Sequence, residues 1–86
     1  MFKIEIAPAV VKSLSAFKLA EPQMYRRFIT VIQSLATEPY QGKKLKGELA
    51  DRYSIRVGTY RIIYCIFKDR LVVFVIDIGH RREVYR

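Results

Sequence analysis

The side chains with the clearest capacity for chemistry are three arginines in the second half of the sequence. Arg52, Arg56 and Arg61 lie within the stretch RYSIRVGTYR. A guanidinium group stays charged at neutral pH and donates paired hydrogen bonds to phosphate or carboxylate oxygens. These arginines are therefore suited to holding an anion and to stabilising negative charge, but poorly suited to accepting a proton.

A candidate proton-transfer group follows the last apolar run, where His80 precedes Arg81 and Arg82. Imidazole is the side chain that ordinarily gains and loses a proton near neutral pH. The alternative is a solvated loop histidine beside two arginines. Cys65 is the single cysteine, which excludes an internal disulfide and a cysteine-based metal site. We expect no metal and no cofactor, since no His, Cys and carboxylate cluster has metal-ligand spacing.

Length and charge restrict the class of protein. The chain has 86 residues, 51% of them hydrophobic, which predicts one domain spanning residues 1–86. Residues 1–40 carry five basic and three acidic side chains, whereas residues 41–86 carry eleven and five. The basic second half favours an anionic partner, either nucleic acid or an acidic protein. No apolar run has the length of a membrane span and the first residues lack a signal peptide's apolar region, so we expect a cytoplasmic protein.

Hydrophobic periodicity predicts the elements that position these residues. Residues 2–7 alternate as a half-buried strand does. Two helices are expected from Pro8 to about Leu19 and from Pro22 to the Glu38-Pro39 pair, forming an antiparallel helical hairpin. A loop at 40–50 precedes strands at 52–57, 60–67 and 71–78, the last apolar enough to be central and covered on both faces. This β-α-α-β-β-β order predicts an α+β fold, a curved antiparallel sheet packed against an α-helical hairpin.

The turn between the first two of these late strands sets which side chains share a face. Gly58 and Thr59 predict a two-residue hairpin turn of type II′. Val57 then lies opposite Tyr60, and Arg56 lies opposite Arg61. The alternate residues of both strands, mostly aromatic and aliphatic, should face the helices.

Two arginines directly across a ladder repel each other, and Arg52 and Ser54 would share their face. A phosphate between Arg56 and Arg61 would offset the repulsion. The alternatives are that Asp77 or a later acidic residue, Glu83, neutralises one arginine, or that both side chains extend into solvent.

The stretches YSIRVGTYRIIY (53–64) and VFVIDIGHRREVY (73–85), preceded by KLKG (44–47), resemble the RelE branch of the RelE/ParE toxin superfamily. The likeness extends over the whole chain and is most specific in its last part. It implies a RelE-like fold and the toxin of a type II toxin–antitoxin pair. A RelE-type toxin enters the ribosomal A site and cuts the mRNA there by attack of a 2′-OH on the scissile phosphate, leaving a 2′,3′-cyclic phosphate without metal.

The resemblance also implies roles for individual residues. Arg56 takes the place of a family lysine, Arg61 that of the arginine holding the scissile phosphate, Arg81 that of the arginine assisting the leaving 5′-oxygen, and Tyr85 that of a tyrosine stacking near the target base. With His80 these form the predicted catalytic set. The predicted RNA or ribosome contacts are Lys43, Lys44, Lys46, Arg52, Ser54 and Arg82.

Other interpretations stay open at several of these positions. The lysine-rich loop is also what ordinary solvated surface looks like. Tyr85 could instead cover an edge of the core. Ser54 stands where RelE has a second lysine, which leaves the group that deprotonates the 2′-OH unassigned.

The implied partners are a cognate antitoxin, with an acidic or amphipathic segment covering the basic sheet in a hetero-oligomer, and the ribosome with mRNA in its A site. No membrane partner is expected. Two other functions remain open on the same scaffold. One is a ParE-like, non-nucleolytic inhibitor of DNA gyrase, and the other is an inactive member acting as an antitoxin-binding co-repressor.

Overall fold

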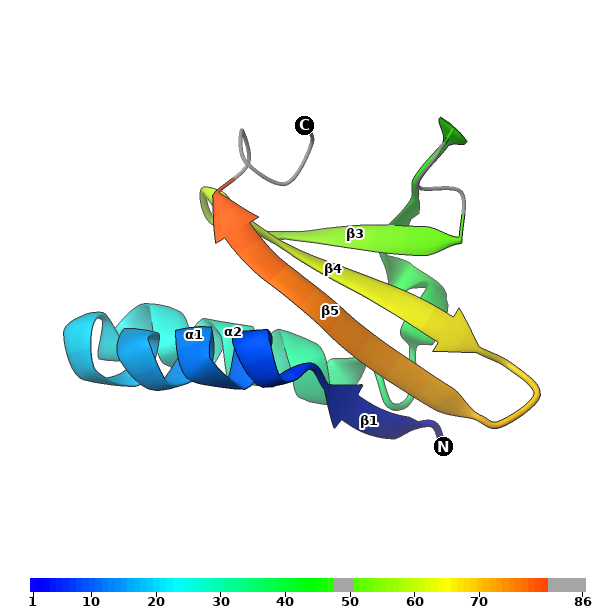
Figure 1. The fold of residues 1–86 in the computed structure, drawn as a ribbon, viewed down its shortest axis with the longest axis horizontal. Coiled ribbons are helices and arrows are strands. Elements are labelled where there is room, and N and C mark those ends of the chain that lie inside the picture. The colour runs from blue at the N-terminus through cyan, green and yellow to red at the C-terminus, as the bar shows by residue number, and fades with distance from the viewer. Residues whose placement is uncertain (48–50, 81–86) are drawn as a thin grey trace.

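The computed structural model describes residues 1–47 and 51–80. Two helices pack against one face of a five-stranded, twisted sheet, which confirms the predicted α+β class (Figure 1). The helices are α1 (Pro8–Ala20) and α2 (Pro22–Ser34), followed by a short 3-10 turn, η1 (Pro39–Gln41). The strands are β1 (Lys3–Ile6), β2 (Lys43–Lys44), β3 (Arg52–Val57), β4 (Tyr60–Phe67) and β5 (Val72–His80).

The sheet is mixed, so the predicted all-antiparallel sheet is wrong at its first strand. The strand order is β1-β5-β4-β3-β2, and β1 runs parallel to β5 while the other pairs are antiparallel. Backbone hydrogen bonds from Lys3 N to Leu71 O and from Ala7 N to Val75 O, 2.8 and 2.9 Å long, flank this pairing. Alternation marks a strand but carries no information on its direction, and the two-residue β2 is too short to give a pattern.

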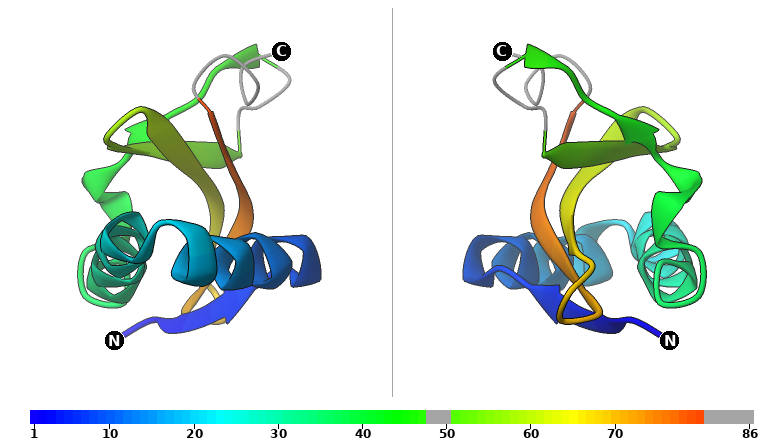
Figure 2. Two further views of the ribbon diagram at one scale, coloured as in Figure 1. Left: turned by 90° about the vertical axis from the view of Figure 1, so that its left-hand side faces the viewer. Right: turned by 90° about the vertical axis from the view of Figure 1, so that its right-hand side faces the viewer.

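The two helices have the predicted starts, and the second ends early. Pro8 and Pro22 each occupy the first turn of a helix, where the missing N–H costs no hydrogen bond. Only Glu21 separates the helices, which cross obliquely rather than running strictly antiparallel (Figure 2). The predicted extension of α2 to Glu38 is wrong, because Ala36 O accepts a 2.8 Å hydrogen bond from Phe2 N and the chain leaves the helix to meet β1.

The core lies between the helices and the sheet. Val57, Ile62 and Tyr64 face the helices, as the hairpin register predicts. Ring contacts of Phe17, Phe28 and Tyr60 at centroid distances of 4.9 to 5.6 Å join both helices to β4. The fully buried side chains among the described residues include Phe28, Leu35, Ile62, Tyr64, Val73 and Val75.

Strand β5 is an interior strand, but only one of its faces is fully covered. Val73 and Val75 are buried, whereas Phe74 and Ile76 on the other side are half-exposed, which corrects the predicted covering of both faces. A bulge shifts the register, so that Ile63 pairs with Asp77 while Tyr64 pairs with Val75. The strand also continues to residue 80, two residues beyond its predicted end.

No helix in the described part of the chain is long and apolar enough to cross a membrane.

Candidate functional site

Arg56 and Arg61 are directly paired across the β3–β4 hairpin, as predicted. The register between these strands runs without a shift from Arg52 to Val57. Gly58 has a φ of 63°. Thr59 has a negative φ, because Leu71 is the single non-glycine residue with a positive φ among the described residues. That combination is the one a type II′ turn requires, which is why the two-residue loop fixes the pairing.

The face of the sheet that turns away from the helices (Figure 1) is here called the open face, and the hairpin register places these arginines on it. Asp77 is exposed on this face, opposite Ile63, which is two residues along β4 from Arg61. A carboxylate thus lies near the arginine pair. This position is the one that Asp77 needs if it, rather than a bound phosphate, neutralises one of the arginines. The described residues of the open face that bear on the site are Arg52, Ser54, Arg56, Arg61, Ile63, Cys65 and Asp77.

Hydrogen bonds hold both paired arginines to the hairpin. Arg61 Nη1 donates to Ser54 Oγ at 3.3 Å, and Ser54 is only 2% exposed. Arg56 Nε donates to the carbonyl oxygen of Gly58, also at 3.3 Å, and its side chain is exposed. Arg61 is half-buried, so its charge is less screened than that of a surface arginine. The pair presents two fixed cations at one end of the open face.

Ser54 therefore touches Arg61 rather than standing out into solvent. Its predicted contact with RNA stays a prediction, and the burial of the hydroxyl leaves little of it within reach of a nucleic acid. Its observed contact gives it a positioning role.

His80 lies on the other face of the sheet. It is the last residue of β5 and pairs with Tyr60, whereas its neighbour Gly79 pairs with Arg61. The imidazole makes an edge contact with the Tyr60 ring at a centroid distance of 5.8 Å. Because successive residues of a strand point to opposite faces, the structure does not bring His80 together with Arg56 and Arg61.

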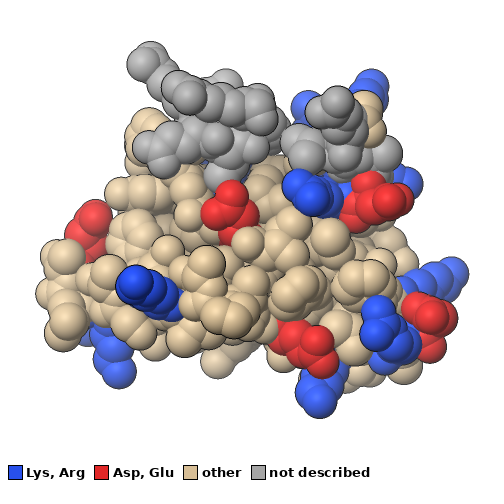
Figure 3. Space-filling model, viewed as in Figure 1, with Lys and Arg blue, Asp and Glu red and all other residues tan. Residues whose placement is uncertain are grey.

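The predicted loop at 40–50 contains β2 (Lys43–Lys44), a strand that the sequence pattern did not predict. Lys43 pairs with Ser54 and so belongs to the open face, while Lys44 pairs with Tyr53 on the opposite side. Lys46 is exposed beyond the strand. In the view of Figure 3, basic side chains gather toward the end of the sheet that carries the start of β3 and the β4–β5 turn, with acidic ones among them.

A buried hydroxyl group anchors this loop. Tyr64 donates to Pro39 O at 2.8 Å and accepts a hydrogen bond from Gly42 N at 3.0 Å. Burial raises the pKa of the Tyr64 phenol, and the hydrogen bond from the Gly42 N–H partly counteracts the rise. Tyr64 thus joins the centre of the sheet to the segment that leads into β2.

A groove of about 570 Å³, here called the end groove, opens beside this loop. It forms because β3 begins at Arg52, opposite Cys65, while β4 runs two residues further. Burial raises the pKa of the Cys65 thiol, although Arg52 acts in the opposite direction. The lining of the end groove includes Tyr40, Lys44, Arg52, Tyr53, Cys65 and Phe67. Lys44 and Arg52 were predicted from the sequence, whereas the aromatic residues of the lining were not, and Tyr40, between Pro39 and Gln41, carries no local signal of a site.

Three predicted site residues, Arg81, Arg82 and Tyr85, lie outside the described residues. Among residues 1–47 and 51–80, no group of three or more His, Cys, Asp or Glu side chains is arranged to hold a metal ion.

Comparison with known proteins places this arrangement in a family. Residues 4–85 match the family described as "ParE toxin of type II toxin-antitoxin system, parDE". The chain is 42% identical over 53 residues to toxin RelG of Mycobacterium tuberculosis, which is 60% of this chain and 61% of RelG. It is 34% identical over 67 residues to the mRNA interferase toxin RelE of Escherichia coli, which is 73% of this chain and 66% of RelE. The matched stretches thus span less than two thirds of the lengths of these relatives.

The fold agrees with the sequence matches. The toxin–antitoxin complex RelBE2 of Mycobacterium tuberculosis contains a chain that superposes with a TM-score of 0.81 at 27% identity, covering 93% of this chain and 98% of that one. The chain belongs to the RelE/ParE superfamily of type II toxin–antitoxin toxins, in its RelE-like branch, as the sequence predicted.

Proposed function

We propose that this chain is a ribosome-dependent mRNA endonuclease, the toxin of a type II toxin–antitoxin pair. The observation that carries the proposal is the pairing of Arg56 with Arg61 on the open face. Two opposed cations form a site that a phosphodiester anion would stabilise. The similarity to a relative named as an mRNA interferase supports RNA as the source of that phosphate.

In this reaction the ribose 2′-oxygen attacks the adjacent phosphorus, the bond to the 5′-oxygen breaks, and a 2′,3′-cyclic phosphate remains. Arg61, held by Ser54, would stabilise the charge that develops on the phosphoryl oxygens. Arg56 would add a second cation from the opposite strand. Arginines contribute little to proton transfer. We therefore expect cleavage to depend on the ribosome, which orients the mRNA for in-line attack.

The proposal includes a protein partner and a location. The solved relative from Mycobacterium tuberculosis is a toxin–antitoxin complex. A cognate antitoxin with an acidic or amphipathic segment would match the exposed cations of the open face and prevent access of mRNA. Action on translating ribosomes would require a cytoplasmic location, and we include that location in the proposal.

The deciding experiment maps mRNA cleavage in a translation extract, with and without ribosomes. The wild-type chain should cut within codons in the A site only when ribosomes are present. Arg61→Ala should lower cleavage by about 100-fold or more, the scale of losing one charge-stabilising donor. Lys12→Ala, which removes a cation from the exposed side of α1, is the matched control and should cut normally. Equal cleavage by both variants would exclude the arginine pair as the site.

Inhibition of DNA gyrase is the second candidate function, because the description of the matching family names the ParE toxin. That activity does not require the paired arginines. A gyrase supercoiling assay with the wild-type chain and the Arg61→Ala variant separates the two functions. Inhibition of supercoiling by both proteins, without mRNA cleavage by either, would favour the gyrase inhibitor.

A further inference from the structure

The end groove combines aromatic surface with positive charge at a place that the arginine pair does not occupy. Tyr40 is 54% exposed although it is a large aromatic side chain. Its ring meets the Tyr53 ring edge-on at a centroid distance of 5.9 Å, and Tyr53 stacks on Tyr64 at 5.6 Å with 18° between the planes. Tyr40 is therefore held in place by a row of rings that ends at a buried anchor.

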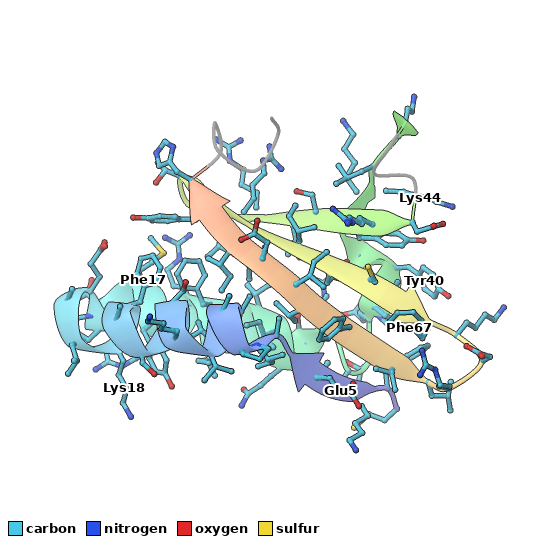
Figure 4. All side chains as sticks on the ribbon, in the orientation of Figure 1. Glu5, Phe17, Lys18, Tyr40, Lys44 and Phe67 are labelled. Atoms are coloured by element: carbon cyan, nitrogen blue, oxygen red, sulfur yellow. The ribbon has the colours of Figure 1, made fainter. Side chains whose placement is uncertain are left out.

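An ordered, exposed ring is a suitable platform for a nucleobase. Bases stack on tyrosine with little dependence on their identity. Because Tyr40 is already held by Tyr53, stacking on it costs less conformational entropy than ordering a free side chain would. Figure 4 shows Tyr40, Lys44 and Phe67 at the same end of the sheet, with Lys18 on α1 at the opposite end.

Charge in the groove favours an anionic strand. Lys44 and Arg52 line it against a single acid, Asp51, and all three are exposed. Arg70 lies over the Phe67 ring, 4.6 Å from its centroid, and adds a further cation at that wall. An acidic peptide would satisfy the cations, but the exposed aromatic ring beside them fits a nucleotide better, since a nucleotide carries both a phosphate and a flat base.

The end groove meets the open face at Arg52, while Lys44 and Tyr53 line it from the opposite side of the sheet. Arg52 lies on the open face with Arg56, four residues along the same strand. At about 3.4 Å per residue this separation is about 14 Å. An RNA strand that runs from the paired arginines along β3 and passes its first residue, Arg52, would reach the end groove.

We propose that the end groove is a second nucleotide-binding subsite, which stacks a base of the single-stranded RNA on Tyr40 and binds the adjoining phosphates through Lys44 and Arg52. This inference rests on the proposed function, because it names how the same substrate is held beyond the cleaved bond. It assigns the predicted RNA contacts at Lys44 and Arg52 to one site. The groove contributes affinity and register rather than chemistry.

The test measures binding of the full chain to a short fluorescent single-stranded RNA carrying 2′-O-methyl groups, which cannot be cleaved. Tyr40→Ala should weaken binding by about 5- to 150-fold, the range for losing one base–aromatic stack. Tyr40→Phe keeps the ring and should bind like wild type. Lys44→Ala and Arg52→Ala should each reduce the slope of log affinity against log salt by about 0.7.

Matched controls separate the groove from general surface effects. Leu19→Ala removes an exposed apolar side chain and Lys12→Ala an exposed cation, both from α1, and neither should change binding. Cys65 lines the groove and is the single cysteine, so bound RNA should slow its alkylation in wild type and not in Tyr40→Ala. Unchanged RNA affinity in Tyr40→Ala, or an equal loss in Lys12→Ala and Lys44→Ala, overturns the subsite.

Two further results distinguish the possible failures. If Tyr40→Ala loses antitoxin binding but keeps RNA binding, the groove is a protein contact and the subsite is overturned. Because the uncleavable RNA reports binding alone, a failed subsite leaves ribosome-dependent cleavage standing. Conversely, Tyr40-dependent binding without any cleavage in the extract supports the subsite and removes the endonuclease.

Discussion

Arg61 reaches across the hairpin to the hydroxyl group of Ser54, with 3.3 Å between Nη1 and Oγ. Ser54 is buried and pairs with Ile63, which is two residues along β4 from Arg61 and on the same face. A short, buried side chain has few rotamers to lose, so it can fix the direction of a long one. Ser54 is therefore a positioning residue for the arginine that we propose holds the phosphate.

Ser54→Ala should lower mRNA cleavage by roughly 10- to 150-fold, because a hydrogen bond that involves a charged group contributes about 1.5 to 3 kcal/mol. Ser54→Thr retains the hydroxyl group and should recover much of the activity. The cleavage rate in a translation extract is the readout, beside a chemical unfolding curve. A loss of activity that merely tracks lost stability in both variants would show a packing role instead.

Arg56→Gln should separate stability from binding. Removing one of two opposed like charges relieves a repulsion of about 0.2 to 1 kcal/mol. The same change removes the hydrogen bond from Arg56 to Gly58, which acts in the opposite direction on stability. The stability without anions should therefore change little, whereas phosphate should raise the melting temperature of wild type more than that of Arg56→Gln. Lys12→Ala should respond to phosphate like wild type, and a response lost there too would point to a general salt effect.

His80→Gln should retain cleavage within about threefold, since general acid–base catalysis would contribute at least about 100-fold if the imidazole took part. The structural reason is that His80 shares a face with Tyr60, not with Arg61. The pH dependence of cleavage by the variant should match that of wild type. A 100-fold loss would restore the histidine to the catalytic set.

Tyr64→Phe should reduce the free energy of unfolding by about 1 to 3 kcal/mol, because Pro39 O and Gly42 N lose a shared partner. The phenol pKa is raised in the folded chain, so the unfolded chain releases this proton first as the pH rises. The contribution of this group to stability is present below about pH 10 and declines above it. Urea titrations from neutral to alkaline pH should therefore show a shallower decline for Tyr64→Phe, and parallel curves would contradict the assignment.

The sequence by itself determined the hairpin and which of its residues share a face. Strand side chains alternate with a period of two, and the Gly58-Thr59 loop permits one register, so the pairing of Arg56 with Arg61 follows from local geometry. The apolar stripes of both helices follow from their periodicity in the same way. Each of these features depends on residues that are near one another in the chain.

Only the tertiary structure decided the features that depend on which segments meet. The parallel pairing of β1 with β5 joins strands at opposite ends of the described chain. The face of His80 follows from the point at which β5 stops and from the bulge beside Ile63. The end groove exists because β4 extends two residues past the start of β3 and because the segment carrying Tyr40 lines the space that this leaves. Local periodicity does not specify strand neighbours, strand ends or bulges, because packing between distant segments sets them.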